Sequence, residues 1–125
     1  MSQGRGSAIV GAATVVCLLL VLHLEVAQAA TYTVGGASGW TFNVVGWPNG
    51  KSFRAGDILV FNYNSSIHNV VALSKAGYDS CKTPSGAKVY QTGKDQIKLV
   101  KGQNSFICNF PGHCESGMKI TITAA

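Results

Sequence analysis

Most side chains in this sequence that could bind a metal ion lie in one short stretch near the carboxyl end. Cys108, His113 and Met118 follow one another at five-residue steps, and a further histidine, His68, lies far upstream. A thiolate, two imidazoles and a thioether form the ligand set of a mononuclear copper site that exchanges single electrons. Glycine residues between the three downstream positions allow the sharp bends that bring them together. The sequence therefore predicts one loop with three ligands and a distant segment with the fourth.

Each of these residues has a more ordinary explanation when it is considered alone. An isolated histidine such as His68 is more often a surface residue or a hydrogen-bonded core residue than a ligand. A lone methionine such as Met118 is more often part of a hydrophobic core. The combination favours ligands, because a trigonal site of two histidines and one cysteine needs a second imidazole. Apart from His23 in the amino-terminal segment, His113 is the only other histidine.

The same ligand set discriminates between metals. Sulfur and imidazole ligands suit both copper(I) and zinc. A thioether is a poor zinc ligand, and structural zinc sites draw their ligands from cysteine and histidine, so Met118 favours copper. All four positions are filled by protein side chains, which leaves no open position for a substrate. Because the sequence also lacks a nucleophile–base pair, we expect a protein that is not an enzyme and that passes single electrons by outer-sphere transfer.

The amino-terminal segment has the pattern of a secretory signal peptide. Arg5 precedes an apolar run over residues 9–22, and Ala27-Gln28-Ala29 is a small-x-small cleavage site. An uncleaved membrane anchor is the alternative, but a spanning helix needs about 20 apolar residues. The carboxyl end lacks the spacer and hydrophobic tail of a lipid-anchor signal. The prediction is a signal peptide over residues 1–29 and one secreted domain over residues 30–125, without a membrane anchor.

The chain is basic, with ten Lys and Arg, five Asp and Glu, and a net charge of +5. Loss of Arg5 and Glu25 with the signal peptide leaves this balance unchanged. The remaining cations are spread from Lys51 to Lys119 and form no run, whereas a nucleic-acid interface would cluster them. We expect no nucleic-acid partner, a monomer, and an unidentified redox partner, either an acidic protein or a cell-wall polyanion. Ordinary solubilising charge explains the pattern equally well.

An odd number of cysteines remains after cleavage, because Cys17 lies in the signal peptide. Cys81, Cys108 and Cys114 allow three disulfide pairings, and any of them leaves one thiol free in an oxidising compartment. Metal ligation by Cys108 explains the free thiol and requires that the other two cysteines pair. Ligation by Cys114 is less favourable, because the side chains of adjacent residues such as His113 and Cys114 point apart in an extended chain.

Strand patterns dominate the rest of the sequence. Short segments rich in β-branched and apolar residues are separated by turns that contain glycine, asparagine or proline, and no segment shows a long helical stripe. At most a short helical turn is expected near residues 75–80. This pattern is typical of an all-β Greek-key sandwich or small barrel. The expected strands cover residues 31–34, 58–63, 69–73, 88–91, 96–100, 105–110 and 118–123.

Several segments resemble plant phytocyanins, and the resemblance covers nearly all of residues 30–125. The segment from Phe106 to Cys114, with its continuation through Gly117-Met118-Lys119, is the most specific of them. The other matching segments are 35–36, 39–42, 53–58, 61–63, 68–71, 86–90 and 95–99.

The resemblance implies a cupredoxin-like Greek-key β-sandwich with one type 1 copper ion. It implies His68, Cys108 and His113 as ligands with Met118 in the axial place, and a disulfide between Cys81 and Cys114. It also implies a redox role in the apoplast or cell wall. Some family members have links to plant reproduction, which gives the alternative of an extracellular signalling or guidance protein whose copper is structural or incidental.

Three further expectations concern the surroundings of the site. Asn69 is placed beside His68, where its hydrogen bonds would tie the two ligand segments together and tune the site. The small Pro111-Gly112 pair would leave one edge of His113 near solvent. Asn64 begins an Asn-Ser-Ser sequon, which predicts a possible N-glycosylation site on a surface loop.

Overall fold

The structure is a computed structural model and describes residues 28–125. The predicted signal peptide, residues 1–29, therefore lies almost wholly outside the described residues. Within residues 28–125, none of the helices has the length and apolar character needed to cross a membrane.

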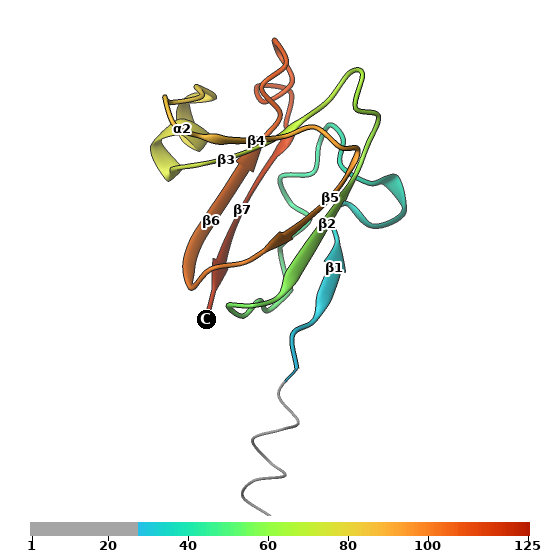
Figure 1. Cartoon of the computed structure of the whole chain (residues 1–125), viewed down its shortest axis with the longest axis vertical. Coiled ribbons are helices and arrows are strands. Elements are labelled where there is room, and N and C mark those ends of the chain that lie inside the picture. Colours follow the sequence, from blue (N-terminus) through green and yellow to red (C-terminus); the bar gives the residue numbers. More distant parts are fainter. Residues whose placement is uncertain (1–27) are drawn as a thin grey trace, which may run out of the picture.

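Two β-sheets face each other and form a sandwich (Figure 1). The first sheet has three strands in the order β1-β2-β5, with β1 parallel to β2 and β5 antiparallel to it. The second has four antiparallel strands in the order β4-β3-β6-β7. The predicted all-β sandwich is confirmed. The strands are β1 (Thr31–Thr33), β2 (Ile58–Asn62), β3 (Val70–Leu73), β4 (Lys88–Tyr90), β5 (Lys94–Lys98), β6 (Gly102–Ile107) and β7 (Lys119–Ala124).

Two strands are shifted by two or three residues from the predicted ranges, whereas the other five agree with the prediction to within one residue at each end. The strand expected over residues 105–110 runs instead over Gly102–Ile107, because the chain leaves the sheet at Cys108 to form the ligand loop. The strand expected over residues 96–100 runs over Lys94–Lys98. It includes Asp95, a charged residue that lies just outside the predicted strand. This carboxylate is buried but accepts hydrogen bonds from Tyr63 and Thr92.

The main core fills the space between the two sheets. Alternate residues of β2 point inward, so that Leu59 and Phe61 are fully buried. The ring of Phe61 contacts Trp40 edge-on at 5.1 Å and Phe106 at 5.2 Å between centroids. Burial of each such side chain stabilises the fold by roughly 1.5–3 kcal/mol. The Trp40 indole also donates a 2.9 Å hydrogen bond to the carbonyl of Asn69, which fixes the segment beside His68 to the core.

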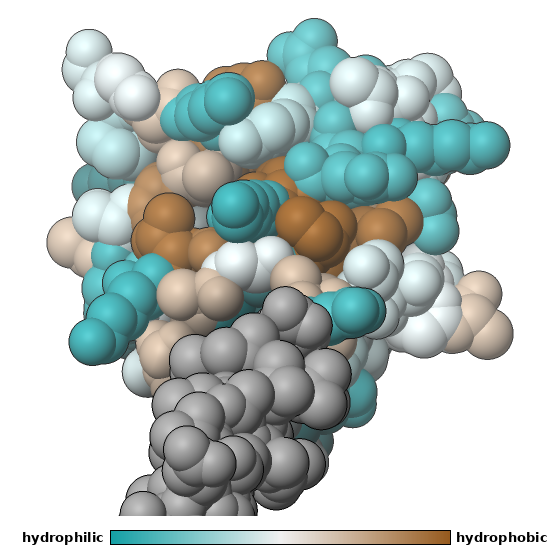
Figure 2. All heavy atoms as spheres, turned by 60° about the horizontal axis from the view of Figure 1, so that its bottom comes forward, coloured by the Kyte–Doolittle hydropathy of each residue, from teal (hydrophilic) through white to brown (hydrophobic). Residues whose placement is uncertain are grey.

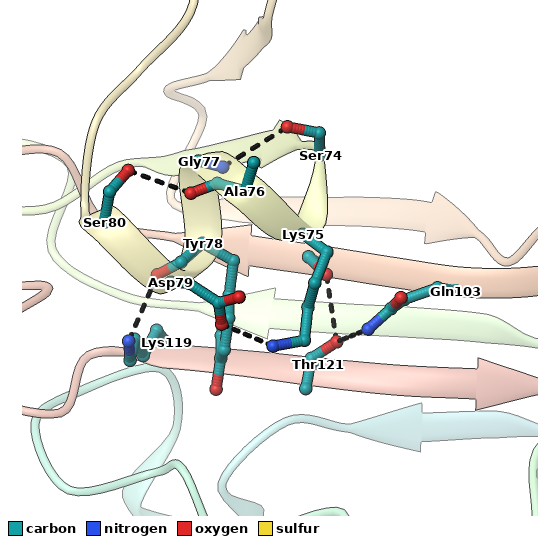
Figure 3. A network of polar contacts seen from close by, with 11 residues as sticks. Ser74, Lys75, Ala76, Gly77, Tyr78, Asp79, Ser80, Gln103, Lys119 and Thr121 are labelled. Atoms are coloured by element: carbon teal, nitrogen blue, oxygen red, sulfur yellow. Dashed lines mark hydrogen bonds and ion pairs between the residues drawn. The ribbon is translucent and has the colours of Figure 1, made fainter.

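A short helix, α2 (Lys75–Ser80), covers the outer face of the four-stranded sheet (Figure 3). It confirms the helical turn expected near residues 75–80. Ser74 caps its amino end by accepting a hydrogen bond from the backbone N–H of Gly77. Tyr78 is buried against the sheet, and Lys119 of β7 donates to the Tyr78 carbonyl at 3.1 Å. The helix positions Cys81 directly after its last turn. A single 3-10 turn, η1 (Gly36–Ser38), completes the helical elements of the described residues.

Candidate metal centre

Cys108 lies immediately after β6, where the hairpin of β6 and β7 opens into a loop. Its side chain is fully buried. Its backbone N–H donates a 3.1 Å hydrogen bond to the carbonyl of Met118, which immediately precedes β7. The hairpin thus places the first and last of the predicted downstream ligands opposite each other, at the end of the sandwich that carries the loop (Figure 1).

The loop between these two positions folds back on itself through tight turns. Gly112 and Gly117 adopt positive φ angles of 80° and 85°, a conformation that other residues rarely adopt. The N–H of His113 donates to the carbonyl of Phe110 at 3.1 Å, and the N–H of Met118 donates to the carbonyl of His113 at 3.0 Å. Backbone hydrogen bonds therefore join Met118 to both Cys108 and His113, and Met118 is itself fully buried.

His68 approaches the same point from the loop between β2 and β3. Its backbone N–H donates a 3.0 Å hydrogen bond to the carbonyl of Asn64, which turns the chain just before β3. Its side chain is buried, in contrast to the half-buried side chain of His113.

The ligand atoms of the two histidines and the cysteine converge. Nδ1 of His68 lies 3.1 Å from Nδ1 of His113, and the same atom of His113 lies 3.5 Å from Sγ of Cys108. All three ligand atoms lie within 4.8 Å of one another. Atoms placed about 2.0–2.3 Å from one shared ion in a trigonal arrangement are about 3.5–4 Å apart. The spacing and chemistry of this donor set fit a single metal ion, with the thioether residue Met118 tied to the same loop.

Asn69 links the two segments that carry the ligands, as expected. Its side-chain amide donates to Oδ1 of Asn109 at 2.6 Å, and its Oδ1 accepts from the backbone N–H of Asn109 at 3.0 Å. Asn109 directly follows Cys108 and also donates to the Thr83 hydroxyl at 3.1 Å. Because Asn69 directly follows His68, this pair of hydrogen bonds fixes the distance between two of the ligand positions.

The protein environment acts on the protonation of the buried groups. Burial raises the pKa of the Cys108 thiol, and backbone N–H groups of Asn69 and Phe110 oppose this by donating to the sulfur. Burial lowers the pKa of His68, and the neighbouring His113 lowers it further. Neutral imidazole is the form that binds metal. The site therefore favours the ligand form of His68, whereas the thiol has to lose its proton when a metal binds.

An aromatic side chain that sequence reasoning did not single out lies against both imidazoles. The ring of Phe42 meets His68 at 5.5 Å and His113 at 4.8 Å between centroids, edge-on in both cases. The ring of Phe110 stacks on His113 at 5.7 Å. Phe42 is 40% exposed, and Pro111 and Gly112 are exposed as well. The expected opening beside His113 is therefore present, and its rim is apolar.

Phe42 reaches this position because its segment is hydrogen-bonded to the ligand loop. The N–H of Val44 donates to the carbonyl of Gly117 at 3.1 Å. A side chain at Gly117 would meet the backbone N of Asn43 at 3.2 Å. No spacing pattern in the sequence marks Phe42 or Asn109, because both depend on contacts between segments far apart in the chain.

The disulfide implied by the family resemblance is present between Cys81 and Cys114. It joins the end of α2 to the ligand loop, directly after His113. Cys108 is the one free cysteine of the described residues and is buried. Asn64 is exposed, and its Oδ1 accepts hydrogen bonds from the N–H and the hydroxyl of Ser66 at 3.0 and 2.6 Å. Glycosylation of Asn64 stays a prediction.

Comparison with known proteins identifies the family. Residues 40–118 match the family model of the plastocyanin-like domain. The basic blue protein of Arabidopsis thaliana is 60% identical over 128 residues, which cover 99% of both chains. The basic blue protein of Cucumis sativus is 65% identical over 95 residues, which cover 76% of this chain and 99% of that relative.

The chain belongs to the basic blue protein (plantacyanin) group of the phytocyanin family. A solved structure described as cucumber basic protein, a blue copper protein, aligns with a TM-score of 0.76 and 66% identity. The alignment covers 77% of this chain and 100% of that one. The family resemblance and the cupredoxin-like Greek-key fold expected for this phytocyanin are thereby confirmed.

Proposed function

We propose that this phytocyanin is a secreted type 1 copper protein that carries single electrons by outer-sphere transfer. His68, Cys108 and His113 would hold the ion, and the thioether of Met118 would be the fourth ligand. The observation that carries the proposal is the convergence of Nδ1 of His68, Nδ1 of His113 and Sγ of Cys108 within 4.8 Å of one another. The blue copper protein among the solved relatives supports the choice of metal.

A copper ion in this position supplies one-electron chemistry, because it is stable in both the cupric and the cuprous state. The protein holds the donor atoms in place beforehand. The buried hairpin fixes Cys108 and Met118, and the paired hydrogen bonds of Asn69 and Asn109 fix His68 relative to Cys108. A donor set that is held rigidly has to move little when the charge of the ion changes.

His113 is the most solvent-accessible of the four proposed ligands, so a docking partner would meet it first. Its side chain is half-buried, whereas His68, Cys108 and Met118 are buried. The rim of Phe42, Phe110 and Pro111 offers apolar surface around it and limits the access of water. Because the proposed ligands occupy the positions around the ion, a substrate has no free coordination position, and we propose that the protein is not an enzyme.

The proposed localisation, oligomeric state and partners are those predicted from the sequence. We propose secretion to the apoplast or cell wall after removal of residues 1–29, a monomeric state, no nucleic-acid partner and no membrane anchor. The redox partner is either an acidic protein or associated with a cell-wall polyanion, in keeping with the net charge of +5. No observation in the described residues favours the alternative of a signalling or guidance protein over electron transfer.

The test is the absorption spectrum of the protein loaded with Cu(II). Wild type is expected to be intensely blue, because a thiolate bound to copper gives a strong charge-transfer band. Cys108→Ser should abolish the colour. Met118→Gln should keep the colour and shift the reduction potential, since the axial ligand tunes it. A colourless wild-type protein would refute the proposal, and an unchanged potential in Met118→Gln would remove Met118 from the ligand set.

A further inference from the structure

A groove of about 350 Å³ lies on one side of the sandwich, away from the metal centre. It runs between β5 of the first sheet and β3 and β6 of the second, where the sheets separate. Tyr90, Ile97 and Phe106 are among its apolar lining residues, and Gln103 adds an amide at its border. Figure 2 tilts the end with the turn between β5 and β6 toward the viewer and shows apolar surface bordered by hydrophilic side chains.

Lysine side chains border this groove. Lys98 is among the residues that line it. Lys88 pairs with Ala72 across β4 and β3, and paired residues lie on the same face of a sheet. Ala72 also lines the groove, so Lys88 lies on the groove face, with Nζ 5.0 Å from the centroid of the Tyr90 ring.

No acidic side chain of the described residues forms a salt bridge with Lys88 or Lys98, which we call the groove lysines. Asp95 is the only acidic residue of β4 and β5. It is 4% exposed, and Tyr63 and Thr92 donate hydrogen bonds to it. The only salt bridge within residues 28–125 joins Lys75 to Asp79 on α2. The groove therefore combines an apolar floor with two lysines that have no salt-bridge partner in the described part of the chain.

We propose that this groove binds an acidic polysaccharide, a chain of uronic acid residues that carry free carboxylates. Sugar rings present C–H faces that pack on an aromatic ring such as Tyr90, and their carboxylates pair with ammonium groups. Lys88 on β4 and Lys98 on β5 belong to the two different sheets that border the groove, so carboxylates on both sides of a bound chain meet an ammonium group. Neither β4 nor β5 contains an arginine, the side chain that binds phosphates and carboxylates through two parallel hydrogen bonds.

The position of the groove gives the binding a consequence for the carrier. Its lining extends along β5 and β6 toward the turn that joins them, whereas the candidate metal centre lies beyond the other end of β6 (Figure 1). A bound polysaccharide would hold the protein on a polyanionic matrix and leave the face around His113 free. The site uses no metal ligand, so it functions with or without copper.

The experiment measures binding of the copper-loaded protein and of the copper-free protein to a de-esterified oligogalacturonate by calorimetry. The test variant is Lys88→Gln with Lys98→Gln. The matched control is Lys51→Gln with Lys82→Gln, which removes the same charge from exposed positions outside the groove. We expect the test variant to lose roughly 3- to 30-fold in affinity, as two exposed ion pairs imply. The control should lose less than 2-fold.

The methyl-esterified oligogalacturonate should not bind, because it lacks free carboxylates. Equal losses in both variants would show general charge attraction and would overturn the proposal. Binding of poly-glutamate or single-stranded DNA with the same affinity and the same sensitivity to the groove variant would overturn the choice of partner. The blue colour of each sample reports separately on the metal centre, so a failure of this proposal is distinguishable from a failure of the copper assignment.

Discussion

Replacement of Asn69 by Ala tests how the two ligand segments are held together. The change removes both side-chain hydrogen bonds to Asn109 and leaves the backbone N–H of Asn109 without its partner. A typical hydrogen bond contributes about 0.5–1.5 kcal/mol, and an unsatisfied buried donor costs about 1–3 kcal/mol. Because Asn109 is itself exposed, water compensates part of this loss. We expect the free energy of unfolding to fall by about 1–3 kcal/mol.

The same change should lower the reduction potential of the copper-loaded protein. The backbone N–H of Asn69 lowers the pKa of the Cys108 thiol by stabilising the thiolate, and a looser segment weakens this stabilisation. The thiolate then carries more electron density and favours the cupric state. A one-electron couple shifts by about 59 mV for a tenfold change in equilibrium constant, so the weakening of one hydrogen bond predicts a shift of tens of millivolts.

Urea unfolding and redox titration measure the two effects on the same variant. Asn62→Ala is the matched control, since Asn62 is exposed, and its loss should change stability by less than about 0.5 kcal/mol. A stability loss in Asn69→Ala no larger than that of the control, together with an unchanged potential, would refute the linking role of Asn69.

Three other predictions concern the disulfide between Cys81 and Cys114, the hydrogen bond between Tyr63 and Asp95, and the sequon at Asn64. Replacement of both Cys81 and Cys114 by Ala should lower the free energy of unfolding by about 3–4 kcal/mol in the chain-entropy model for a separation of 33 residues; a loss below 1 kcal/mol in urea unfolding would contradict it. Burial and the hydrogen bond to Asp95 raise the pKa of Tyr63 to about 12 from 10.0. The unfolded state therefore loses the phenol proton first, and the associated stability, about 1–3 kcal/mol, is present below pH 10 and lost as the pH rises through 12. Comparison of wild type with Tyr63→Phe in alkaline unfolding checks this, and identical pH profiles would exclude it. Protein secreted from plant cells should carry a glycan at Asn64 that Asn64→Gln and Ser66→Ala both remove; an unmodified intact mass of the wild type would show that the sequon is unused.

The sequence alone indicated the candidate ligand residues and predicted the fold class, because both depend on local signals. The five-residue spacing of Cys108, His113 and Met118 reflects one loop between two strands of a hairpin, and alternation of apolar residues marks the strands. The odd cysteine count left three pairings open. Metal ligation by Cys108 would leave Cys81 and Cys114 to pair, and the family resemblance implied the same disulfide, which the structure contains.

The rest of the site depends on contacts between distant segments, which local patterns do not record. Phe42 lies against both imidazoles only because the backbone N–H of Val44 donates a hydrogen bond to the carbonyl of Gly117. The predicted strand begins after Asp95, because the hydrogen bond that compensates the burial of this carboxylate comes from Tyr63, 32 residues away in the chain. The groove lysines are isolated charges along the sequence. Only the pairing of β4 with β3 shows on which face of the sheet Lys88 lies.

A crystal structure of the copper-loaded protein, with anomalous scattering measured at the copper edge, tests the central claim most directly. We expect one anomalous peak within bonding distance of Nδ1 of His68, Nδ1 of His113 and Sγ of Cys108, with the sulfur of Met118 at a longer distance. A peak at any other place, or a Cys108 sulfur engaged in a disulfide, would contradict it.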